Sequence, residues 1–98
     1  MKKNDGNLKE LLQAILQLRN LDECERFLVD LCTPAELRSM ADRWRAARLV
    51  AEGIPYRLIY QRIGVSTATV TRVARALTQG EGGYQVVLDR SRKRVSHA

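Results

Sequence analysis

The segment YRLIYQRIGVSTATVTRVARAL, residues 56–77, constrains the fold more than any other part of this 98-residue chain. It contains two helical patterns separated by Gly64 and the two residues that follow it. Glycine most easily adopts the left-handed backbone of such a turn, and Ser66 can cap the next helix. With Tyr56 as its first residue, a helix-turn-helix motif must bury five positions, and all are apolar. We therefore predict this motif over about residues 56–78, with its inner face formed by Ile59, Ile63, Val65, Val70 and Val73.

Apolar residues at helical spacing predict that the N-terminal side of the chain is helical as well. One stripe covers residues 7–18, and a second begins at Leu21. The predicted fold class is all-α, with residues 1–80 forming one small helical domain. Residues 81–98 begin with the breaker GEGG and end in the basic sequence SRKRVSHA, so we expect a flexible basic C-terminal segment. The sequence YQVVLDR between them is compatible with a short helix or a strand.

A third helix is predicted to begin just after Thr33. Threonine can cap a helix start, proline suits the first helical position, and Glu36 can bond back to the threonine. The helix should end near Gly53, in a left-handed conformation. Apolar residues occupy two sides of this helix, and a short chain buries only a modest share of its own surface. Both observations favour an obligate homodimer, whose core we expect to contain Leu12, Ile15, Phe27, Leu31 and Trp44.

Charge is distributed unevenly along the chain. The first 52 residues carry nine basic and nine acidic side chains, whereas residues 53–98 carry eight basic and two acidic ones. The net charge of +6 therefore arises entirely in the second part, and no acidic residue occurs between Glu52 and Glu81. A one-sided positive field is what a polyanion-binding surface needs, although short basic runs are often only solvated.

The exposed face of the second helix in the motif suits contact with DNA. Short side chains near a helix start allow close approach to base edges, threonine methyls can meet thymine methyls, and guanidinium groups can bond bases or phosphates. We predict that the helix 67–78 enters the major groove of a palindromic operator. The alternative is a helical dimeric protein–protein interaction module without specific DNA binding, which weaker salt dependence would reveal. The predicted DNA-binding residues are Arg57, Ser66, Thr67, Ala68, Thr69, Thr71, Arg72 and Arg75.

Other functional classes find little support in the sequence. The one histidine is His97, no glycine-rich phosphate loop is present, and no nucleophile has an evident base, so we do not expect an enzyme. Cys24 and Cys32 cannot complete a metal site with that histidine. No apolar run reaches the roughly 20 residues of a membrane span, and the first residues lack the apolar centre of a signal peptide. We expect a cytoplasmic protein without a membrane partner.

The sequences LCTPAELRSMADRWRAARLVAEG and YRLIYQRIGVSTATVTRVARAL, in this order, resemble the Trp repressor family, and most closely its small YerC/YecD-type branch. The resemblance covers residues 31–77 and extends more loosely over the two N-terminal helices. It implies an all-helical, intertwined homodimer in which the N-terminal helices wrap around the partner. Together with the charge distribution, it leads us to predict a sequence-specific, dimeric DNA-binding transcription regulator that acts as a repressor.

The resemblance further implies an effector pocket between the third helix and the DNA-reading helix. Arg43 and Arg72 match the two arginines that flank the tryptophan ring in the Trp repressor, and Thr33 matches a threonine at the pocket rim. Val73 replaces a glycine, and Ala76 replaces a serine that holds the amino group of the ligand. Valine should crowd the ring, and alanine leaves the buried ammonium poorly paired. No cofactor is implied with certainty; a small-molecule effector stays open, but we do not expect L-tryptophan.

Overall fold

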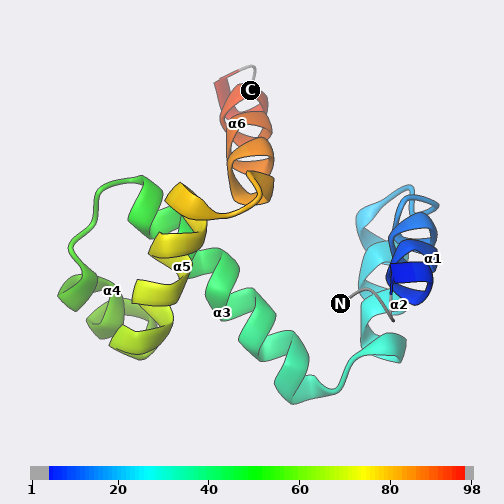
Figure 1. Ribbon diagram of the computed structural model, residues 1–98, viewed down its shortest axis with the longest axis horizontal. Helices are drawn as coiled ribbons and strands as arrows, with labels where there is room; N and C mark the ends of the chain where they lie inside the picture. Colours follow the sequence, from blue (N-terminus) through cyan, green and yellow to red (C-terminus); the bar gives the residue numbers. More distant parts are fainter. Residues whose placement is uncertain (1–4, 97–98) are drawn as a thin grey trace. The chain divides into compact units, whose positions relative to one another are not determined.

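The computed structural model describes the backbone of residues 5–96 and the side chains of residues 6–92. These residues form six helices and no strand, which confirms the all-α prediction (Figure 1). The chain divides into two compact units: an N-terminal unit that ends at Leu37 and a C-terminal unit that begins at Arg38. Within the described part, no helix is both long enough and apolar enough to cross a membrane.

The N-terminal unit contains α1 (Asp5–Ile15) and α2 (Leu21–Leu31). The start of α2 is fixed by Asn20, whose side chain accepts a hydrogen bond from the Glu23 N–H at 2.8 Å. The carboxylate of Glu23 in turn accepts a bond of 2.9 Å from the N–H of the residue before Asn20. These reciprocal bonds satisfy N–H groups near the start of the helix that lack an intrahelical partner.

The third helix, α3 (Pro34–Ala51), begins with the predicted capping arrangement. The Thr33 N–H donates to Glu36 Oε1 at 2.8 Å, and the Glu36 N–H donates to Thr33 Oγ1 at 3.1 Å. Hydrogen bonds from Thr33, first that of its backbone N–H and then that of its side chain, lower the pKa of Glu36 because they favour the charged carboxylate. The helix also ends where predicted, and Gly53 has the expected left-handed backbone with φ of 83°.

The C-terminal unit has a core of its own, formed where α4 (Tyr56–Ile63) and α5 (Thr67–Gln79) pack with the second half of α3 (Figure 1). Alanines on α3 allow the other helices to come close, and branched side chains of the two shorter helices fill the space. This packing holds α4 and α5 in a fixed geometry. The buried core residues are Ala46, Ala47, Ile59, Val65, Val70 and Val73.

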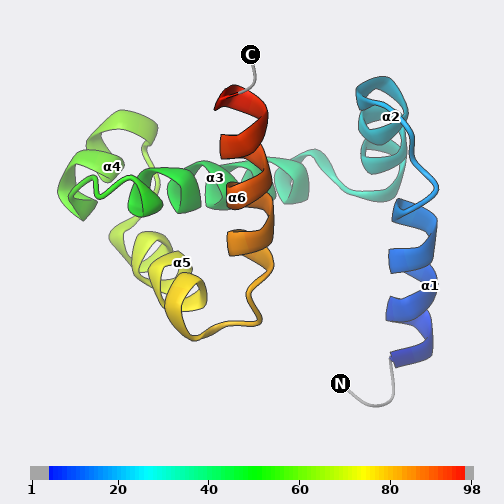
Figure 2. The ribbon, with the colours of Figure 1, turned by 90° about the horizontal axis from the view of Figure 1, so that it is seen from above.

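The end of the chain differs from the prediction of a flexible segment over residues 81–98. Most of it forms a helix, α6 (Gly83–Ser96), which crosses α3 (Figure 2). The ring of Tyr84 stacks on that of Trp44 with centroids 6.2 Å apart, and Leu88 is buried. The expectation was wrong because Tyr84 and Leu88, which are spaced as on one face of a helix, gain their packing partners only in the folded unit. Residues 97–98 lie outside the described residues.

Candidate nucleic-acid interface

The structure confirms the helix-turn-helix motif, because the predicted apolar positions lie on its inner face. Ile59 of α4 and Val70 of α5 are fully enclosed, and Val73 is only 2% exposed. Val65 of the turn is buried, and Ile63 is half-buried and packs against the same core. The burial of this face leaves the opposite faces of both helices to solvent.

The turn between the two helices depends on Gly64. Its φ of 70° and ψ of 14° are left-handed, and its N–H donates to the Tyr60 carbonyl at 2.8 Å. A residue with a Cβ would pay a conformational cost of about 1–2 kcal/mol in this region, and glycine avoids it. Val65, directly after Gly64, is buried in the core. Because it is held there, the packing of the core helps to fix the angle between the two helices.

Ser66 caps α5, as predicted. Its Oγ accepts a hydrogen bond of 3.2 Å from the Thr69 N–H, and its hydroxyl donates to Thr69 Oγ1 at 3.0 Å. The Thr69 side chain is half-buried. Both residues were predicted to bind DNA; what the structure shows is that their side chains hold the first turn of the helix in place.

The remaining predicted residues of α5 share one exposed surface. Thr67, Ala68 and Thr71 lie on its first two turns, followed by Arg72 and Arg75, and all five are exposed. Spacings of three and four residues bring members of this set side by side on a helix. The predicted Arg57 is exposed as well, on α4.

The motif carries positive charge without a local counter-charge. Four exposed arginines belong to it: Arg57, Arg62, Arg72 and Arg75. Among the residues that the structure describes, the one ion pair joins Arg26 to Asp22 at 3.0 Å, on α2. The guanidinium groups of the motif are therefore available to phosphate groups, for which arginine has a well-matched geometry.

A model of the Trp repressor protein family matches residues 6–92 of the chain. The chain belongs to the Trp repressor family. It is 46% identical over 83 residues to the uncharacterized protein YerC of Bacillus subtilis, a match that covers 85% of this chain and 80% of YerC. Its fold is shared by regulators rather than by a family of enzymes.

Two crystal structures share this fold closely. A candidate Trp repressor from Staphylococcus aureus superposes with a TM-score of 0.87 at 42% identity, over 93% of this chain and 91% of that one. A TrpR-like protein from Eubacterium eligens gives a TM-score of 0.86 at 38% identity, over 92% and 94% of the two chains.

The residues predicted for an effector pocket differ in their exposure. Val73 belongs to the core, Ala76 and Arg43 are half-buried, and Arg72 is exposed. The hydroxyl of Thr33, in the N-terminal unit, accepts the helix-capping bond from Glu36. The core position of Val73 agrees with the expectation that its side chain occupies space which a glycine would leave open.

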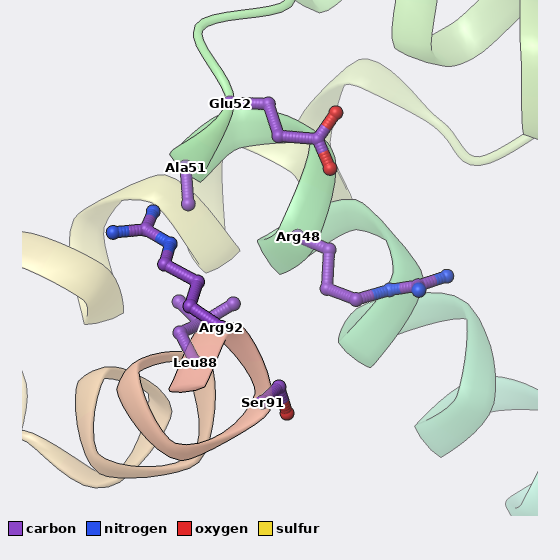
Figure 3. Close-up of a pocket in the computed structure, with 6 residues that line it drawn as sticks. All are labelled: Arg48, Ala51, Glu52, Leu88, Ser91 and Arg92. Atoms are coloured by element: carbon purple, nitrogen blue, oxygen red, sulfur yellow. The ribbon is translucent and has the colours of Figure 1, made fainter. Parts of the chain in front are cut away.

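A groove of about 250 Å³ between α3 and α6 was missed by the sequence analysis. Figure 3 shows the guanidinium groups of Arg48 and Arg92 extending to opposite sides of it, so they do not converge on one anion. The groove exists because α6 packs on α3, and the one sequence signal was the helical spacing of Tyr84 and Leu88. Its lining consists of Arg48, Ala51, Glu52, Leu88, Ser91 and Arg92.

Proposed function

We propose that this member of the Trp repressor family is a dimeric repressor that binds a palindromic DNA operator with α5 in the major groove. The observation that carries the proposal is the exposed surface of the helix-turn-helix motif. Short side chains lie at the start of α5, exposed arginines follow on both helices, and no acidic residue occurs between Glu52 and Glu81. A surface of this kind can approach base edges closely while its arginines bind the phosphates on either side.

The proposal of a dimer rests on apolar surface that the single chain leaves uncovered. None of the described residues of the N-terminal unit is fully buried. A second copy that covers this surface would place two motifs on one duplex, with recognition helices about 34 Å apart, one turn of DNA. The exposed apolar residues of α1, α2 and the turn that joins them are Leu8, Leu12, Ile15, Leu16, Leu21, Val29 and Leu31.

Helix α6 also has exposed apolar side chains, which further support the proposal of a dimer. Val86 and Val87 are each about half exposed, on the sides of the helix away from the buried Leu88. A soluble helix normally shows one apolar stripe, and a second one indicates another packing partner. Trp44, by contrast, already packs against the core of its own chain and stacks on Tyr84.

The experiment that tests DNA binding is selection of bound duplexes from a random pool at physiological salt. We expect a palindromic sequence with half-sites about one helical turn apart. Binding to it should weaken steeply with salt, because each neutralised phosphate contributes about 0.9 to the slope of log K against log salt. Failure to recover any sequence would favour the alternative of a protein–protein interaction module.

A matched pair of variants assigns the salt dependence to the motif. Arg57→Gln should lower the salt slope by about 1.8 for a dimer, since two phosphate contacts are lost. Arg26→Gln removes the same charge from α2, where the arginine is paired with Asp22, and should leave the slope unchanged. Equal effects of the two substitutions would indicate non-specific attraction by net charge.

A further inference from the structure

The first two turns of α5 present methyl groups rather than amides or carboxylates. Thr67, Ala68 and Thr71 are exposed there, and no Asn, Gln, Asp or Glu occurs from Ile63 to Leu77. Thr67 and Thr71 are four residues apart, and Ala68 and Thr71 are three apart, so their side chains lie on neighbouring positions of one face. We call these three residues the methyl patch.

The composition of this surface limits which base edges it can recognise. Adenine is usually read by the paired donor and acceptor of Asn or Gln, and the cytosine amino group by Asp or Glu. The methyl patch has neither. Alanine and threonine methyls can pack against the C5-methyl group of thymine, which protrudes into the major groove.

Hydrogen bonds at the start of α5 reduce the number of hydroxyl groups that can contact bases. Of the four hydroxyl groups at positions 66–71, those of Ser66 and Thr69 already bond each other across the cap at 3.0 Å. That bond, with the one from the Thr69 N–H, also fixes the backbone that carries the methyl patch. The methyl patch thus combines methyl groups with the hydroxyls of Thr67 and Thr71, on a backbone that the helix cap holds in place.

We propose that the methyl patch selects operators by the C5-methyl groups of thymine. This inference rests on the proposed function and adds the chemical class of base that α5 recognises. In each half-site, one or two thymines opposite the start of α5 are distinguished from cytosine by their methyl group. Their loss should weaken binding without changing the phosphate contacts or the salt slope.

The test replaces thymine by deoxyuridine, one position at a time, in the selected operator. The replacement removes only the methyl group and keeps the base pair. Burial of one methyl group is worth about 0.8 kcal/mol, which corresponds to about a fourfold change in affinity. Because the site is palindromic, replacement in both half-sites should weaken binding about 16-fold. Fluorescence anisotropy at constant salt measures both changes.

A protein variant then links the thymine methyl to the patch. Thr71→Ser removes a methyl group and keeps the hydroxyl, so the penalty for deoxyuridine at the facing position should fall to less than twofold. Thr78→Ser is the matched control, since Thr78 lies at the far end of α5 and its hydroxyl bonds to backbone carbonyls of the same helix. This control should retain the full penalty.

Two negative outcomes can be told apart. If a specific operator is recovered but deoxyuridine at every thymine position leaves affinity within twofold, methyl recognition is overturned and the proposed function stands. If no operator is recovered, the proposed function fails and the inference fails with it. A deoxyuridine penalty that persists in Thr71→Ser and in the corresponding Thr67→Ser variant would also overturn the assignment to the patch.

Discussion

The two compact units differ in where their apolar side chains lie. In the C-terminal unit, branched side chains of α4 and α5 are enclosed by their own chain. In the N-terminal unit, Leu16 and Leu21 are 82% and 85% exposed, and none of the described residues is buried. Burial of one leucine is worth about 1.5–3 kcal/mol, so a surface of this kind is normally covered by another molecule. The unit that carries the helix-turn-helix motif therefore supplies its own core, whereas the exposed apolar surface of the other unit suits association with another molecule.

The two units also differ in how their arginines are placed. The N-terminal unit holds the ion pair of Arg26 with Asp22, while four arginines of the helix-turn-helix motif are exposed. The exposed positive charge of the motif therefore belongs to the C-terminal unit, and the exposed leucines belong to the N-terminal unit. Under the proposed function, assembly would depend on the N-terminal unit and DNA contact on the C-terminal unit.

The largest expected effect comes from breaking assembly. Leu12→Glu places a charge on an apolar stripe of α1 and should convert the dimer to a monomer, seen by light scattering. Operator affinity should fall by about 100-fold or more, because one chain can no longer engage both half-sites. Hydrogen exchange of α5 should stay protected, since its core lies within the C-terminal unit.

The control for this prediction is Tyr60→Glu, which places the same charge on a side chain of α4 that is as exposed as Leu12. It should leave the molecular mass of the dimer unchanged. A Leu12→Glu protein that stays dimeric would contradict the assignment of assembly to the N-terminal unit.

A substitution in the core tests whether the C-terminal unit is stabilised by its own enclosed side chains. Ile59→Ala should reduce the free energy of unfolding by about 2–5 kcal/mol, as expected for a fully enclosed side chain. Tyr60→Ala, at the adjacent exposed position of the same helix, should change it by less than about 0.5 kcal/mol. Urea unfolding measures both, and equal losses would show that the enclosed core of the C-terminal unit does not dominate its stability.

A smaller effect is expected at the helix cap in the N-terminal unit. The pKa of Glu36 lies below its ordinary value of 4.5, so the ionised carboxylate stabilises the folded state. This contribution is fully present above pH 4.5 and is lost as the pH falls through the lowered pKa. Glu36→Gln keeps a side chain that suits the capping box but does not titrate.

Urea midpoints between pH 6 and pH 3 check this prediction. The difference between the wild type and Glu36→Gln should be constant in the upper part of the range and shrink in the lower part. Thr33→Ala, in turn, should move the Glu36 titration seen by NMR toward 4.5. An unchanged titration would mean that the Thr33 side chain has no part in the shift.

Most of the fold could be predicted because its signals are local. The cap at Thr33, the left-handed Gly64 and the apolar spacing around Val70 are all visible within a few residues of sequence. The sequence left a helix or a strand open for residues 84–90, and it could not show that α6 packs on α3, because the stacking of Tyr84 on Trp44 joins positions 40 residues apart. The first helix ends at Ile15, three residues before the end of its apolar stripe, since a leucine stripe by itself carries no stop signal.

Features of the candidate site could likewise be predicted where they depend on helical spacing, and could not where they depend on side-chain conformation. Exposure of Thr71, Arg72 and Arg75 follows from helical spacing once Val70 and Val73 are assigned to the core. The bond between the hydroxyls of Ser66 and Thr69 depends on side-chain rotamers, which the sequence does not specify. That DNA is bound at this surface stays a prediction.

The last prediction is that L-tryptophan has no effect on this protein. It concerns the place where the core of this chain meets the position of the effector pocket in the Trp repressor family. A ligand that binds the folded state stabilises it by RT ln(1 + [L]/Kd), about 2.7 kcal/mol at 100 times Kd. Val73 is part of the core and Ala76 has no hydroxyl to accept a bond from an ammonium group. Millimolar L-tryptophan should therefore leave both the melting temperature and the operator affinity at the values measured with equal L-alanine. A rise in either with tryptophan alone would show that the C-terminal unit opens around Val73, and that its core is less closed than that residue's 2% exposure indicates.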